Sequence, residues 1–177
     1  MDWTKLLQKK IEHTYKTTDN LMNLVDDDML DWKPSPDNNW MTVAQLLMHI
    51  CISCGAPMRG IVTGDWGLPD DMDINDLTPE QIELVTPDAE KMPTVESVAF
   101  ARQFLAEDKQ IALETLGSCS EEELAEKPTP VPWDSGETVL GHLLLDMVAH
   151  LSHHKAQLFY YLKLQGKPVN TVHLCGA

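Results

Sequence analysis

Residues 138–164, TVLGHLLLDMVAHLSHHKAQLFYYLKL, are the stretch that decides the fold. Apolar residues recur along it every three or four positions, which is the period of one face of an α-helix. Gly166 and Pro168 follow and are residues that end helices. The stretch therefore predicts a long amphipathic helix from about Thr138 to Leu164. It also holds three of the chain's seven histidines within five positions, residues 150 to 154.

The same period predicts three more helices, over about residues 3–30, 43–56 and 94–116. Thr42 and Gln45 form a capping box at the start of the second. The intervening segments read as a long loop at 57–92 with a helical turn at 79–84, a turn or short helix at 120–127, and a proline-broken loop at 128–136. Few windows resemble strands. We expect a single all-α domain over residues 1–177, a four-helix bundle with a long connection between helices two and three. A less regular α-domain is the alternative.

The composition limits the partners and the location of the chain. Its net charge is −15, with 13 basic residues scattered among 28 acidic ones. A nucleic-acid binder usually carries a basic patch, so we expect neither nucleic acid nor an anionic membrane as a partner. No run of apolar residues approaches the roughly 18 that span a bilayer, and no signal peptide is visible. A soluble cytoplasmic protein is expected. Cys51 and Cys54 form a CxxC without a second pair, which favours buried, inert thiols.

Rotation about the last helix selects two of its histidines. At 100° per residue, the apolar stripe of the helix spans about 100°, and His150 and His154 fall at its edge and inside it. His142 and His153 fall outside and are expected to be solvated or to support the ligand residues from behind. Residues at i and i+4 stand one above the other, which lets one helix offer two imidazoles to one ion. A third ligand should come from another helix, and His49 is the best candidate because it lies among apolar residues of the second helix. The alternative is that these are core or rim histidines without a metal.

Other side chains could support such a site. Three of them lie within one turn of a candidate ligand and could orient it: Asp146, Gln157 and Ser53. Three aromatic residues could wall a pocket or pack in the core: Trp40, Trp133 and Tyr161. We expect His13 and His173 to be surface residues.

At this point the chain resembles the DinB-like (DinB/YfiT) family of metal-binding four-helix bundles. The resemblance rests on WKPSPDNNWMTVAQLLMHI, on HLSHHKAQLFYYLKLQGKPV, and on the order of the helices. It implies a metal triad of His49, His150 and His154, which agrees with the rotational argument. Two positions depart from the family pattern, since Lys155 stands where arginine is usual and Ala156 where glycine is usual. Lysine lacks the bidentate fork of arginine, so any carboxylate-binding role of the position is in doubt.

Three histidines with an open position form a site of the catalytic type. Imidazoles suit several divalent metals, and we expect zinc or nickel first. The resemblance implies a thiol-dependent S-transferase or isomerase that uses a low-molecular-weight thiol and a small-molecule substrate. Two alternatives stay open: metal-dependent hydrolysis of a small substrate, and a non-catalytic metal-binding or dimerisation module. A homodimer is expected because Leu145, Val148 and Phe159 form an apolar back face on the last helix, which a partner or segment 57–92 would cover.

Overall fold

The computed structural model describes residues 2–37, 39–69, 72–74, 76–78, 80–81 and 87–176. The long helices are α1 (Trp3–Met22), α5 (Val98–Gly117) and α7 (Leu140–Leu164). The shorter ones are α2 (Val43–Ile50), α3 (Gly55–Thr63), α6 (Glu121–Glu126) and α8 (Thr171–Cys175). Most of the described chain is helical, so the all-α prediction is confirmed at this level.

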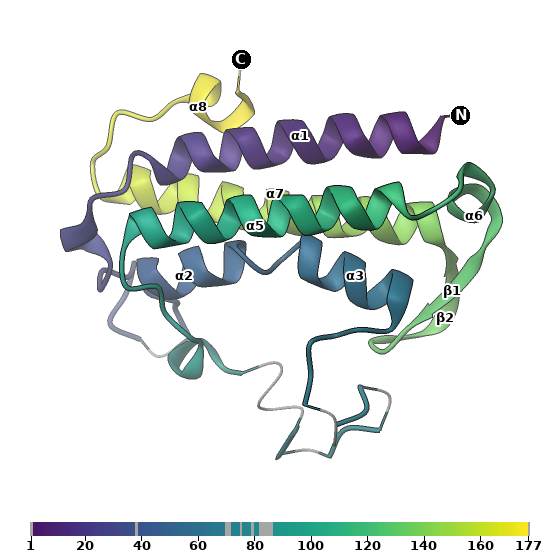
Figure 1. The fold of residues 1–177 in the computed structure, drawn as a ribbon. Coiled ribbons are helices and arrows are strands. Elements are labelled where there is room, and N and C mark those ends of the chain that lie inside the picture. Colours follow the sequence, from purple (N-terminus) through teal and green to yellow (C-terminus); the bar gives the residue numbers. More distant parts are fainter. Residues whose placement is uncertain are drawn as a thin grey trace.

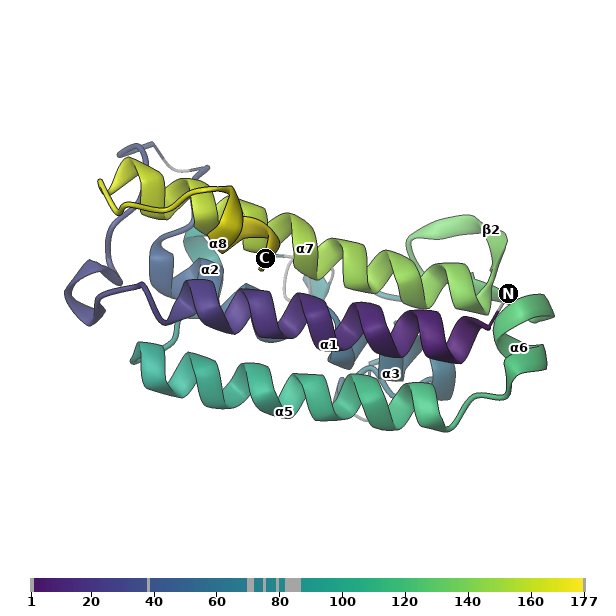
Figure 2. The same cartoon turned by 90° about the horizontal axis from the view of Figure 1, so that it is seen from above.

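The three long helices α1, α5 and α7 lie side by side with their axes roughly parallel (Figures 1 and 2). α1 packs against both α5 and α7, while α2 packs mainly on α7 and α3 on α5. Because α7 also contacts α6 and α8, it has neighbours on several sides. This explains why its buried residues extend well beyond the predicted stripe to Val148, Lys155 and Phe159.

The first helix ends earlier than predicted, at Met22 instead of about residue 30. The chain then makes a short 3-10 turn, Asp27–Met29. The first residue of this turn contacts another helix. The Asp27 carboxylate accepts a hydrogen bond of 2.7 Å from the backbone N–H of Val98, at the start of α5. An acceptor at a helix N-terminus satisfies a backbone donor that has no partner within the helix. α5 itself begins at Val98, four residues later than expected.

The predicted second helix is two helices. α2 ends at Ile50, residues 51–54 interrupt the ladder, and α3 continues from Gly55 to Thr63 (Figure 1). Pro57 lies in the first turn of α3, where a missing N–H breaks no helical bond. We had expected Gly55 and Pro57 to end a helix, whereas they belong to the first turn of the next one. The connection to α5 accordingly begins after Thr63 and not at residue 57.

Where a proline-broken loop was predicted at 128–136, the chain forms a β-hairpin that runs on to Val139, so the last long helix begins at Leu140 and not at about Thr138. β1 (Pro128–Val131) pairs antiparallel with β2 (Asp134–Val139), with an irregularity between Pro130 and Val131. Alternate residues of a strand point their N–H groups in the same direction, so Pro128 and Pro130 both place their missing donors on the free edge of this two-stranded ribbon. The prolines are therefore compatible with a strand here. The C-terminal helix α8 was also not predicted.

The helical turn that was predicted at 79–84, in the connection after α3, falls mainly on residues outside the described ranges.

One apolar stretch is long enough to be compared with a membrane span. Within the described residues, Val43–Thr63 is the one stretch long and apolar enough for such a span, with a mean hydropathy of 1.4. That stretch is the α2–α3 pair, and 56% of it is buried inside the protein. Its apolar composition is accounted for by its place in the core.

The apolar back face of α7 is not free. Val148 and Phe159 are buried inside the chain itself, and Leu145 packs partly against the core. The surface from which a homodimer was expected is therefore covered by the protein's own elements. The homodimer stays a prediction, without this surface as its basis.

Candidate metal centre

The structure brings the three predicted ligand residues together. His49 lies in the last turn of α2, and His150 and His154 lie one turn apart near the middle of α7. The Nε2 atom of His154 is 3.0 Å from Nε2 of His49 and 2.8 Å from Nε2 of His150. One nitrogen from each ring lies within 4.8 Å of the other two. Three imidazoles from two helices thus point the same atom at one place.

The three rings are half-buried, and their surroundings favour the neutral form. Burial, followed by the neighbouring rings of His154 and His150, lowers the pKa of His49 to about 4. Burial is also the main cause that lowers the pKa of His150 and of His154. A neutral imidazole keeps one lone pair, which is the form that binds a metal ion.

Gln157 decides which nitrogen of His154 carries the hydrogen. Its side-chain oxygen lies 3.0 Å from Nδ1 of His154. An amide oxygen can only accept, so Nδ1 is the N–H and Nε2 carries the lone pair. The lone pair faces the other two rings, as a metal ligand requires. Gln157, one of the three predicted supporting residues, therefore contacts the cluster directly.

Ser53 contacts the cluster in a way that the sequence did not indicate. Its hydroxyl donates to the carbonyl of Ile50 at 3.1 Å and does not face the rings. Its backbone instead acts on His150, whose pKa is lowered mainly by burial and raised in part by a hydrogen bond with the Ser53 backbone. Backbone groups inside an α-helix are used by the helix itself, so the interruption at residues 51–54 is what frees this one. The break in the second helix thus helps to hold a ligand of the cluster.

The interruption is anchored by a buried carboxylate from α5, which sequence reasoning missed. Asp108 is 3% exposed and accepts hydrogen bonds from the backbone N–H groups of Gly55 and Ala56, at 2.9 and 2.8 Å. It also accepts one from the hydroxyl of Tyr15, at 2.6 Å. A carboxylate at the N-terminus of a helix satisfies its free donors and its dipole. Nothing local in the sequence signals this contact, because Asp108 lies 53 positions from Gly55.

Comparison with known proteins identifies the family. A sequence model of the DinB superfamily matches residues 10–158. The chain belongs to the DinB superfamily. Among solved structures, it is similar to the crystal structure of a candidate DinB family member from Exiguobacterium sibiricum 255-15, with a TM-score of 0.65 and 21% identity over 98% of each chain. At that identity the likeness shows the fold alone. No curated protein matches the chain. The family resemblance read from the sequence is confirmed.

Other predicted residues of this DinB-superfamily chain lie away from the cluster or contact it indirectly. Asp146 is exposed, and within the described residues no hydrogen bond joins it to the three rings. His153 is exposed on α7, and His142 packs against Trp3 with ring centroids 5.1 Å apart. His173 caps α8 through its Nδ1 atom, which accepts from the N–H of Asn170 at 3.2 Å. Trp133 is 57% exposed and packs edge-on against Trp66, so it does not wall the histidines.

The cysteines of the CxxC are buried, as predicted. Burial raises the pKa of both Cys51 and Cys54 to about 12. The thiol of Cys51 donates to the carbonyl of Ala101 at 3.0 Å, and that of Cys54 to the sulfur of Met58 at 3.7 Å. A nucleophilic cysteine needs a lowered pKa and access to solvent. Neither thiol of the pair has these properties.

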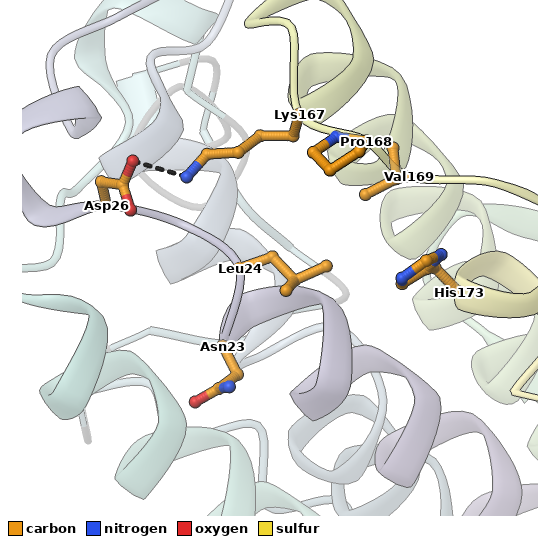
Figure 3. Close-up of a pocket in the computed structure, with 7 residues that line it drawn as sticks. All are labelled: Asn23, Leu24, Asp26, Lys167, Pro168, Val169 and His173. Atoms are coloured by element: carbon orange, nitrogen blue, oxygen red, sulfur yellow. Dashed lines mark hydrogen bonds and ion pairs between the residues drawn. The ribbon is translucent and has the colours of Figure 1, made fainter.

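A separate pocket lies at the end of α1, beside the segment that joins α7 to α8. Its volume is about 360 Å³, and Figure 3 shows Lys167 reaching across to Asp26 and His173 on another wall. The Lys167 ammonium forms an ion pair with the Asp26 carboxylate at 2.5 Å. None of the three clustered histidines lines this pocket, so it is distinct from the candidate metal centre.

Proposed function

We propose that this DinB-superfamily protein is a metal-dependent enzyme whose divalent ion is held by His49, His150 and His154. The observation that carries the proposal is the convergence of three Nε2 atoms, with the hydrogen of His154 held on its other nitrogen by Gln157. A single lone pair on His154 faces two rings at short range. An ion shared by all three rings would satisfy them together, whereas one lone pair accepts one strong hydrogen bond.

His49 faces the cluster through its Nε2 atom. Its Nδ1 is buried and has no hydrogen-bond partner among the described residues. Its Nε2 lies 3.0 Å from Nε2 of His154 and is the nitrogen that would bind an ion shared by the three rings.

Three protein ligands favour a site with further positions open. His49, His150 and His154 would hold the ion, and a divalent metal with three protein ligands keeps a position for water or substrate. Zinc and nickel both accept imidazole, and we propose one of these two.

We propose thiol-dependent transfer or isomerisation of a small molecule as the reaction class. A divalent ion supplies the acidity that converts a thiol or a water molecule into a nucleophile at neutral pH. The chain's own residues bind the ion, orient His154 through Gln157, and keep the three rings neutral. The thiols of Cys51 and Cys54 are buried and point to other partners, and we propose a low-molecular-weight thiol from solution as the nucleophile. Metal-dependent hydrolysis is the alternative reaction of the same site.

We also propose that α2 and α3 together act as one member of a four-helix bundle. They lie end to end in Figure 1, beside the three long helices. The long connection of this bundle is then the segment between Thr63 and Val98.

Metal content tests the proposed function. We expect about one zinc or nickel ion per chain, by elemental mass spectrometry, in protein purified without an affinity tag or chelator. The His49→Ala and His154→Ala variants should lose the ion, since each removes one of three ligands. His153→Ala is the matched control, because His153 lies beside His154 but is exposed and outside the cluster, and it should keep the ion. Wild-type protein that holds no metal and takes up none on addition would overturn the proposal.

The cobalt-substituted protein separates the two reaction classes. If a thiol joins the ion, adding a low-molecular-weight thiol should change the visible absorption spectrum of the cobalt protein, and His154→Ala should abolish the change. An unaltered spectrum at millimolar thiol would favour hydrolysis. Small ester and amide substrates are then the compounds to assay.

A further inference from the structure

A line of three directional hydrogen bonds runs from the backbone before α2 to a ligand of the cluster. The hydroxyl of Tyr161 donates to the carbonyl of Met41 at 3.1 Å. Gln157 and Tyr161 lie one turn apart on α7; burial raises the pKa of Tyr161, and a hydrogen bond from the Gln157 side chain partly offsets this rise. The oxygen of Gln157 then accepts from Nδ1 of His154 at 3.0 Å. Together these contacts connect Met41 to His154.

The direction of each bond follows from the one before it. The Met41 carbonyl can only accept, so it takes the single hydrogen of the Tyr161 hydroxyl. The tyrosine oxygen is then left as an acceptor, and it pairs with the NH₂ group of Gln157. This orientation of the amide places its oxygen on His154, which puts the hydrogen of that ring on Nδ1. If the amide turned over, its NH₂ group would face Nδ1 and the hydrogen would move to Nε2, the atom that faces the cluster.

The far end of this line is held firmly. Met41 precedes Thr42, whose side chain and backbone N–H form the capping box of α2 with Gln45. The next backbone N–H, of Val43, donates to the carbonyl of Trp32 at 2.9 Å. Tyr161 is 2% exposed, and its ring meets that of Trp32 edge-on with centroids 5.6 Å apart. These contacts hold the backbone beside the acceptor and the ring of the tyrosine in place.

We propose that Tyr161 is a positioning residue that, through Gln157, keeps the Nε2 lone pair of His154 directed at the metal centre. Tyr161 touches neither the three imidazoles nor, in this reading, the ion. Its role is to choose the orientation of an amide that would otherwise turn over. The consequence for metal binding rests on the proposed function, but the orientation of the amide can be measured in metal-free protein.

The test compares Tyr161→Phe with Tyr160→Phe. Phenylalanine keeps the buried ring and removes only the oxygen, while Tyr160 is its 61% exposed neighbour and serves as the control. Long-range ¹H–¹⁵N correlation spectra of metal-free protein report which nitrogen of His154 carries the hydrogen. We expect the Nδ1–H form alone in wild-type and Tyr160→Phe protein, and a mixture of both forms in Tyr161→Phe. Zn²⁺ affinity, measured by competition with a fluorescent zinc chelator, should fall about tenfold in Tyr161→Phe only.

A second substitution tests the mechanism. In the double variant Tyr161→Phe with Gln157→Glu, the carboxylate has two acceptor oxygens and no donor, so turning it over changes nothing. We expect the Nδ1–H form of His154 to return, and the zinc affinity with it. If Tyr161→Phe folds with an unchanged circular dichroism spectrum and His154 stays wholly in the Nδ1–H form, the inference is wrong. If Tyr161→Phe shows the mixture of His154 forms but wild-type protein binds neither zinc nor nickel, the proposed function is refuted and the positioning role stands.

Discussion

Asp108 and Gly55 show how a single contact can decide where a helix begins. The Asp108 carboxylate satisfies two donors of α3, and its backbone oxygen approaches α3 so closely that a Cβ added to Gly55 would lie 2.0 Å from it. Any side chain at this position would force α3 and α5 apart. Glycine is required here for space, and the short approach is what lets the carboxylate reach the backbone.

We therefore predict that Gly55→Ala destabilises the protein by at least about 2 kcal/mol, since overpacking against backbone cannot be relieved by a rotamer change. Chemical denaturation with urea, followed by circular dichroism, measures the loss. Gly117→Ala is the control, because a Cβ at Gly117 meets nothing within 4 Å. That variant should stay within about 0.5 kcal/mol of the wild type. Equal stability of the two variants would contradict the close packing of α3 on α5.

Some residues in and around the histidine cluster could be predicted from the sequence, and others could not. The periodicity of residues 138–164 was enough to place His150 and His154 on one face, because that inference needs only the geometry of one helix. Gln157 could be proposed for the same reason. The contacts of Asp108 and of the Ser53 backbone could not, since both depend on the interruption at residues 51–54. A pattern of apolar residues does not record where a side chain from a distant helix supplies a cap.

The helices and the hairpin also show what an apolar pattern in the sequence can and cannot predict. Long apolar patterns predicted α1, α5 and α7, although α1 ends about eight residues earlier than expected and α5 begins about four residues later. The α2–α3 break was missed because the apolar pattern continues through it, and the donors it leaves free are satisfied by Asp108. The hairpin was missed because three prolines in five residues are usually read against a strand. They are tolerated here since, among the residues that the structure describes, β1 pairs with β2 alone.

α8 depends on a buried lysine. Lys155, at the position where the family usually has arginine, is 7% exposed, and its ammonium donates to the carbonyl of Leu174 at 2.9 Å and to the hydroxyl of Thr17 at 3.3 Å. Thr17 belongs to α1, Lys155 to α7 and Leu174 to α8, so one side chain joins three helices. Hydrogen bonds from a charged donor are stronger than those between neutral groups. The role of Lys155 is to hold the C-terminal helix in place.

We predict that Lys155→Met loosens α8 while the rest of the fold stays intact. Methionine fills a similar volume but donates no hydrogen bond, so the carbonyl of Leu174 loses its partner. Hydrogen exchange should show backbone amides of α8 exchanging about tenfold faster, with protection in α5 and α7 unchanged. Lys9→Met, at an exposed position of α1, is the control and should exchange like the wild type. Cooperative destabilisation of every helix would show instead that Lys155 supports the whole core.

Folding of the whole chain is coupled to protons held in its core. Burial raises the pKa of Cys54 to about 12 and raises that of Tyr15, so both groups stay protonated in the folded protein at alkaline pH. In the unfolded chain a thiol ionises near pH 9 and a phenol near pH 10. Above those values the unfolded state binds fewer protons than the folded state. Stability from these groups is then fully present below about pH 9 and declines as the pH rises.

We predict that the free energy of unfolding falls between pH 8.5 and 10.5, and that Cys54→Ala falls less steeply than the wild type. A single thiol lowers the free energy of unfolding by at most about 1.4 kcal/mol per pH unit, because the folded state binds at most one more proton at this thiol than the unfolded state does. Urea denaturation in the presence of a reducing agent gives both curves. Other groups that titrate in this range are common to the two proteins, so the difference in slope reports Cys54. Cys175→Ala removes an exposed thiol and should keep the wild-type slope. Parallel curves for wild type and Cys54→Ala would mean that the Cys54 thiol ionises as readily inside the protein as in the unfolded chain.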